Sequence, residues 1–139
     1  MLKIIVDTNV LVSALIQRSY PYLIIDRILA GEHCRICLSP ALLAEYFDVL
    51  NRKKFSQFPE FLQNAQRLLI ALERLSLMYN PKINIDLLKD KDDNKILELA
   101  DISRADFIIT GNIKDFTIDR YQESRIVTPR NFWEMHFIP

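Results

Sequence analysis

Two short apolar runs, LKIIV at residues 2–6 and FII at residues 107–109, constrain the fold of this chain more than any other feature. Each run is rich in β-branched residues and is followed at once by polar residues, which is typical of a strand that is buried on both faces. Such strands occur in parallel sheets whose two faces are covered by helices. We therefore predict a mainly parallel central sheet enclosed by helices.

The segments between these strands have the spacing and punctuation of helices. Apolar residues recur at 61, 62, 65, 68, 69, 72 and 75, which predicts an amphipathic helix over residues 59–75. Ser39-Pro40 and Thr128-Pro129 each place a proline after a capping residue, which predicts a helix start. The other predicted elements are helices at 10–16, 21–30, 41–52 and 93–105 and strands at 35–39, 76–80 and 125–127. The resulting order, β-α-α-β-α-α-β-α-β-β-α, predicts a three-layer α/β/α fold.

Composition limits the domain count and the classes of function. With 139 residues, the chain is predicted to form a single domain, residues 1–139. Its 18 Lys and Arg residues balance 18 Asp and Glu residues, so binding to a polyanion would depend on a local basic patch. The only two glycines, Gly31 and Gly111, are too far apart to form a G-x-x-x-x-G-K loop and too few for a G-x-G-x-x-G loop. The N-terminus does not resemble a signal peptide, and no apolar run approaches the ~18 residues of a membrane span, so we expect a cytoplasmic protein without a membrane partner.

Cys34 and Cys37 form a C-x-x-C motif next to His33. A structural zinc site normally needs four ligands, and the chain has no second cysteine pair. A redox pair usually opens a helix, whereas these cysteines are predicted to lie at a strand. We interpret them as buried thiols of a reducing compartment, with a metal or redox role as the alternative.

Polar residues follow both apolar runs directly: Asp7-Thr8-Asn9 after the first and Thr110-Gly111-Asn112 after the second. Active sites of parallel α/β folds lie beyond the carboxyl ends of the strands, so these two clusters are candidates for a functional site. The other acids that are candidates to join them are Glu45, Asp92, Asp93 and Asp115.

Each candidate acid also has an ordinary structural interpretation. Asp7 could cap a helix, Glu45 could reach solvent, and Asp92 and Asp93 could stabilise the positive end of a helix. Asp115 could be a solvated loop acid. Acids that gather at one edge of a sheet repel one another, however, and are tolerated when a divalent cation neutralises them. Oxygen ligands suit Mg²⁺ or Mn²⁺, which can activate a water molecule to hydrolyse a phosphodiester.

Four segments together resemble the PIN-domain family and, more narrowly, the VapC-like toxins of bacterial and archaeal toxin–antitoxin pairs. They are IIVDTNVLVSALI, SPALLAEYFDVL, DDNKILELADISRADFIITGN and IVTPRNF, which together cover nearly the whole chain. The D-T-N-V start and the D-x-x-(I/F)-L-E-x-A…A-D-x-I-(I/V)-T-G pattern are specific in combination. The resemblance implies a Mg²⁺- or Mn²⁺-dependent ribonuclease with an RNA substrate. It also implies a small antitoxin protein as partner and, as in many relatives, a homodimer.

The resemblance also implies roles for particular residues. The three catalytic acids of the family fall on Asp7, Glu45 and Asp93, with Asp92 as the alternative to Asp93. The fourth acid falls on Asn112, whose amide oxygen can still coordinate a metal or orient its water but brings no charge. The remaining matches are Asp115, a further acid of some members, and four supporting polar residues, Thr8, Asn9, Ser13 and Thr110.

The sequence leaves three other interpretations. In the first, the PIN fold is a non-catalytic binding module whose metal site is degraded at Asn112. In the second, the chain is a haloacid-dehalogenase-like phosphatase, but Asn9 then replaces the second acid of its first motif. The order of its later motifs also disagrees, because the paired acids at 92–93 precede Thr110 instead of following it. A signalling receiver domain would need paired acids after the first strand, which this chain lacks.

Basic residues are the remaining candidates for contacts with a substrate. Lys53, Lys54 and Lys114 could bind the phosphates of RNA if the site is a nuclease. The ordinary alternative for such residues is a solvated surface.

Overall fold

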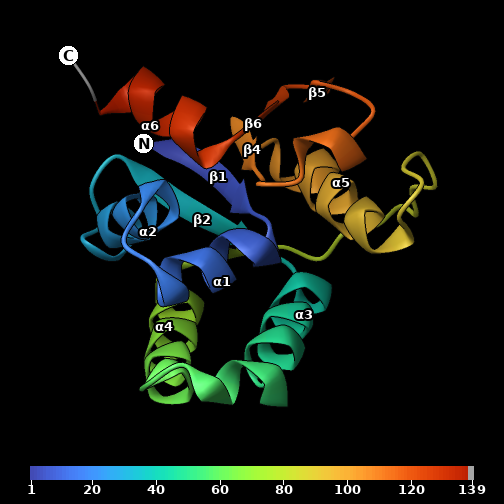
Figure 1. Cartoon of the computed structure of the whole chain (residues 1–139). Helices are drawn as coiled ribbons and strands as arrows, with labels where there is room; N and C mark the ends of the chain where they lie inside the picture. The colour runs from blue at the N-terminus through green and yellow to red at the C-terminus, as the bar shows by residue number, and fades with distance from the viewer. Residues whose placement is uncertain (138–139) are drawn as a thin grey trace.

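The computed structural model describes residues 1–137, apart from the side chain of Asp115. Figure 1 shows the strands at the centre of the molecule and the helices around them. The elements in chain order are β1 (Leu2–Val6), α1 (Thr8–Ile16), α2 (Tyr20–Leu29), β2 (Cys34–Leu38), α3 (Pro40–Leu50), η1 (Lys53–Gln57), α4 (Phe61–Leu75), β3 (Leu77–Met78), α5 (Lys91–Ser103), β4 (Phe107–Ile109), η2 (Ile113–Asp115), β5 (Arg120–Tyr121), β6 (Ser124–Val127) and α6 (Pro129–His136).

The strands form one sheet in the order β3-β2-β1-β4-β6-β5. All neighbouring strands are parallel except β5 and β6, which are antiparallel. The prediction of a mainly parallel sheet is therefore confirmed. Strand β5 was not predicted, because two residues are too short to carry a recognisable pattern.

Helices cover both faces of the sheet. Consecutive residues of a strand point to opposite faces, and Ile4, Ile5 and Val6 of β1 are all fully buried. Helix α5 contacts β1 and β2, and helices α2 and α4 contact β2. This confirms the predicted three-layer α/β/α architecture. None of the helices in the described chain is both long and apolar enough to cross a membrane.

Side-chain caps fix where most of the helices begin. Ser39 and Thr128 accept hydrogen bonds of 3.1 Å from the backbone amides of Leu42 and Asn131, as predicted for the starts of α3 and α6. The predicted start of α5 at residue 93 was wrong, because the helix begins at Lys91. Asp90 caps this helix by accepting a 3.0 Å hydrogen bond from the amide of Asp92, which satisfies an amide that the helix itself leaves unpaired.

The two cysteines are buried in the core, at 2% exposure for Cys34 and 0% for Cys37. Burial raises the pKa of each thiol to about 11, so both remain protonated at neutral pH. A buried, protonated thiol is a poor metal ligand and a poor nucleophile. The structure therefore favours the interpretation as packing residues.

Candidate active site at the carboxyl edge of the sheet

The candidate site begins one residue beyond the ends of β1 and β4. These strands pair in parallel with Val6 opposite Ile109, and the amide of Asp7 donates to the carbonyl of Ile109 at 2.9 Å. Thr110 follows Ile109 directly, and its hydroxyl donates to Oδ2 of Asp7 at 2.7 Å. The parallel register thus places two residues that are far apart in sequence side by side at the carboxyl edge.

Asp7 is a carboxylate with little access to water. It is 6% exposed, and its Oδ1 accepts a 2.8 Å hydrogen bond from the amide of Thr8, so it also serves as the N-cap of α1. Burial raises the pKa of Asp7, hydrogen bonds from Thr110 and Thr8 lower it, and the charges of Glu45 and Asp90 raise it, with a net upward shift. An ionised Asp7 is therefore stabilised by any cation that enters beside it.

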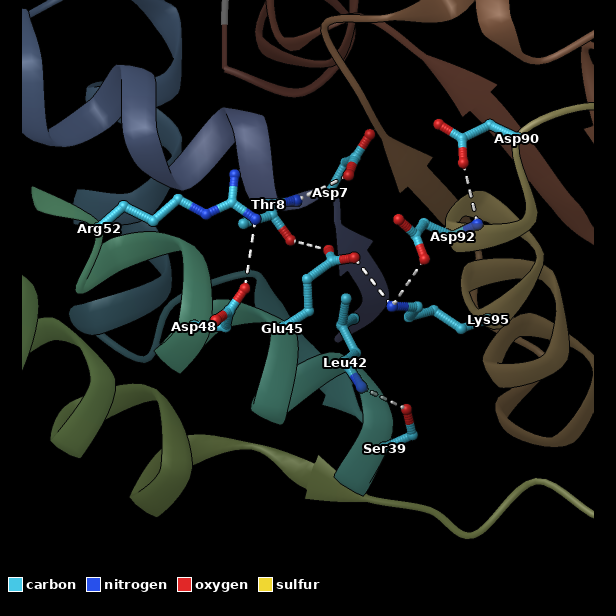
Figure 2. A network of polar contacts seen from close by, with 10 residues as sticks. All are labelled: Asp7, Thr8, Ser39, Leu42, Glu45, Asp48, Arg52, Asp90, Asp92 and Lys95. Carbon is cyan, nitrogen blue, oxygen red and sulfur yellow. Dashed lines mark hydrogen bonds and ion pairs between the residues drawn. The ribbon is translucent and has the colours of Figure 1, made fainter. Parts of the chain in front are cut away.

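Helix α3 carries Glu45 to the same edge. The next residue, Tyr46, is fully buried and its hydroxyl donates to the carbonyl of Val6, which anchors α3 to the end of β1. The hydroxyl of Thr8 donates to Oε2 of Glu45, so Thr8 links the Glu45 carboxylate to that of Asp7. Figure 2 shows this chain of contacts from α1 to α3.

Helix α5 contributes Asp92, Asp93 and Lys95 to the site. The ammonium of Lys95 lies 2.9 Å from Oε1 of Glu45 and 3.8 Å from Oδ1 of Asp92 (Figure 2). Asn94 is buried, and its side chain accepts a 2.8 Å hydrogen bond from the amide of Leu88 and donates to the Leu88 carbonyl at 3.3 Å. These two bonds hold the segment before α5 against the helix, which positions the cap residue Asp90.

Most of the residues that were predicted to form the site line one cavity of about 820 Å³. The predicted residues that line it are Asp7, Thr8, Asn9, Ser13, Glu45, Lys54, Asp92, Asp93 and Asn112. Thr110 is fully buried, does not line the cavity, and donates a hydrogen bond to Asp7. Lys53 and Lys114 do not line this cavity; Lys114 instead lines a second cavity of about 590 Å³, which shares Asp90 with the first. The predicted ligand Asp115 has its side chain outside the described part of the structure.

Four charged residues of the cavity were not predicted from the sequence: Asp48, Arg52, Asp90 and Lys95. Arg52, just after the end of α3, forms an ion pair of 3.2 Å with Asp48. Arg52 and Lys95 are the basic residues of the cavity besides Lys54. Asp90 could have been recognised as a cap from its spacing of two residues before Asp92. Lys95 had no distinguishing signal, because a lysine three residues after an acid is usually a surface pair.

The donor chemistry of the cavity fits a divalent cation such as Mg²⁺ or Mn²⁺, because the acidic and amide side chains offer only hard oxygen ligands. The side chains are not gathered around a single point, however. Among the described side chains, which do not include that of Asp115, no three Asp, Glu, His or Cys residues are placed together so that they could hold one ion. The oxygens of Asp7 and Glu45 accept hydrogen bonds from Thr8, Thr110 and Lys95 instead.

Comparison with known proteins identifies the family. The PIN domain family matches residues 3–114. The uncharacterized protein MJ1680 of Methanocaldococcus jannaschii is 33% identical over 147 residues, which cover 96% of this chain and 90% of the relative. A chain in the crystal structure of VapBC2 from Rickettsia felis, bound to a DNA fragment from their promoter, superposes with a TM-score of 0.58.

The VapBC2 match covers 91% of this chain and 98% of the other at 16% identity, a level that shows a shared fold. The family match leaves the phosphatase and receiver interpretations without support. Because the match spans well over half of the sequence, the chain belongs to the PIN-domain family, as its motifs predicted.

Proposed function

We propose that this protein is a metal-dependent endoribonuclease and the toxin component of a toxin–antitoxin pair. The observation that carries the proposal is Asp7, an almost fully buried carboxylate at the carboxyl edge of the sheet. Its raised pKa and its position in a cavity with five further acids favour the entry of a cation. Membership of the PIN-domain family supports the assignment to nucleases.

The proposed metal ligands are Asp7, Asp93, Asp92, Asn112 and Asp115, and the proposed catalytic acids are Asp7, Glu45 and Asp93. Bound Mg²⁺ or Mn²⁺ would lower the pKa of a coordinated water and so supply the nucleophile. The contribution of the chain is to orient these oxygens: Thr110 and the Thr8 amide hold Asp7, and the Thr8 hydroxyl holds Glu45. Arg52 and Lys54 line the same cavity and would bind the phosphates that flank the cleaved bond.

The partner assignments are also part of the proposal. The structural likeness to VapBC2, together with the sequence motifs, supports a small antitoxin as partner. RNA as substrate and an antitoxin as inhibitor both imply a cytoplasmic protein. A homodimer completes the proposal, on the strength of the family resemblance alone.

The experiment combines calorimetric titration with Mn²⁺ and cleavage of a single-stranded RNA, with DNA of the same sequence in parallel. We expect Asp7→Asn to abolish both metal binding and RNA cleavage. Asp26→Asn is the matched control, because Asp26 is an exposed acid of α2 that does not line the cavity. Binding and cleavage that survive Asp7→Asn would refute the site, and cleavage of DNA but not RNA would refute the substrate.

A second candidate function is a PIN-fold module that binds RNA without cleaving it. It is favoured by Asn112 in place of an acid and by the lack of a three-ligand cluster among the described side chains. The two functions differ in one result: the binding module would retain RNA in the presence of Mn²⁺ and leave its length unchanged.

A further inference from the structure

Lys95 places a positive charge inside the cavity that the proposed metal would enter. Its ammonium contacts Glu45 at 2.9 Å and Asp92 at 3.8 Å, so it bridges an acid of α3 and an acid of α5. Figure 2 shows it reaching from α5 between the two carboxylates. It therefore lies between two of the carboxylates that the proposed function assigns to metal binding or catalysis.

The Lys95–Glu45 pair differs from the ion pairs on the surface. The side chains of Lys95 and Glu45 are 22% and 19% exposed, whereas those of Arg104 and Glu123 are 67% and 59% exposed. A partly buried pair is screened less by water and salt than an exposed one. The pair also leaves Glu45 with one oxygen bonded to Lys95 and the other to Thr8, so neither oxygen is without a donor.

We propose that Lys95 is a displaceable internal counter-ion of the proposed metal site. Its ammonium neutralises Glu45 and Asp92 while no metal is bound, and it leaves Glu45 when a divalent cation enters. This inference rests on the proposed function, because it requires that a cation binds in this cavity.

Two physical reasons support the displacement. An ammonium and a divalent cation that approach the same carboxylate repel each other strongly at separations of a few ångströms. The ammonium also contacts Oε1 of Glu45 at 2.9 Å, an oxygen that a cation bound to Glu45 would need. Lys95 therefore weakens metal binding, and removing its charge should strengthen it.

The first test is calorimetric titration of the full chain with Mn²⁺ in wild type, Lys95→Met and Lys91→Met. Methionine keeps the length of the side chain and removes the charge. Lys91 is the matched control, because it is an exposed lysine one turn earlier on α5. We expect Lys95→Met to bind Mn²⁺ at least tenfold more tightly than wild type and Lys91→Met to differ by less than threefold. Equal or weaker binding by Lys95→Met would overturn the inference.

The second test uses the wild-type protein, so it remains valid if Lys95→Met does not fold. An amine-reactive acylating reagent is applied with and without Mn²⁺, and the modification of each lysine is followed by mass spectrometry. We expect Mn²⁺ to speed the modification of Lys95 several-fold and to leave Lys91 unchanged. If Mn²⁺ binds in an Asp7-dependent way and Lys95 reacts no faster, the inference is wrong while the proposed function stands. If neither wild type nor Lys95→Met binds Mn²⁺, the proposed metal site fails, and the inference fails with it.

Discussion

Replacing Thr110 by valine should destabilise the protein in a way that depends on the charge of Asp7. Thr110 is fully buried, and its hydroxyl donates to Oδ2 of Asp7 at 2.7 Å. The same hydroxyl accepts a 3.1 Å hydrogen bond from the amide of Asn112, which lies at the exposed edge of the site. Valine is nearly isosteric with threonine, so the substitution removes the hydroxyl and little else.

The expected loss follows from the two hydrogen bonds. A bond to a charged group contributes about 1.5–3 kcal/mol, and its loss leaves one oxygen of a buried carboxylate without a donor. Water can replace the partner of the Asn112 amide, so that bond adds little. We expect Thr110→Val to lower the free energy of unfolding by about 2–3 kcal/mol at pH 7.5. For a chain of this size, each kcal/mol lost lowers the melting temperature by roughly 3–5 °C.

The loss should shrink in acid. Burial raises the pKa of Asp7 above its ordinary value of 3.8, so its contribution to stability is fully present below pH 3.8 and is lost as the pH rises through the pKa of the folded state. Thr110→Val removes a bond that lowers this pKa, so the pKa rises further and more stability is lost at neutral pH. A protonated Asp7 does not depend on the Thr110 donor in the same way.

Urea denaturation of the metal-free protein at pH 7.5 and pH 4.5, followed by circular dichroism, measures both effects. Thr110→Ser is the control, because it keeps the hydroxyl and loses only a methyl group. A difference between Thr110→Val and wild type below about 0.5 kcal/mol, or one that is equal at both pH values, would refute the role assigned to this hydrogen bond.

Three further changes have defined expectations. Asn112→Asp adds a charge to the cavity and should tighten Mn²⁺ binding by about tenfold, or ~1.4 kcal/mol, which calorimetry would measure; unchanged affinity would remove Asn112 from the site. Lys54→Ala should reduce the log–log salt slope of RNA binding by about 0.7, and Lys53→Ala should leave it unchanged, because Lys54 lines the cavity and Lys53 does not. Equal effects of the two substitutions would contradict this assignment. Burial, with a smaller effect of Arg125, lowers the pKa of His136, so the stability that neutral His136 contributes above pH 6.5 is lost as the pH falls. His136→Phe should therefore reduce the loss of melting temperature between pH 7 and pH 5. An unaltered pH profile of the melting temperature would exclude His136 as the source of that loss.

Local patterns were enough to predict most of the fold. The run LKIIV is buried on both faces because its residues are apolar on both, and that property is visible without a structure. Ser39 and Thr128 cap their helices through contacts with residues three positions later, so these starts depend only on neighbours in sequence. Strand β5 was not predicted, because its antiparallel pairing with β6 depends on the turn between the two strands and not on the two residues of β5.

The sequence alone also predicted that three acids would lie at one edge, because the carboxyl ends of the strands in a parallel α/β fold face the same side. Asp7, Glu45 and Asp93 line one cavity as a result. Only the tertiary structure decided how those carboxylates are balanced. The contacts of Glu45 with Thr8 and Lys95 join residues 37 and 50 positions apart, and no local pattern encodes such a contact. The same holds for the bond from Thr110 to Asp7, which exists because the parallel register of β1 and β4 brings together residues 103 positions apart.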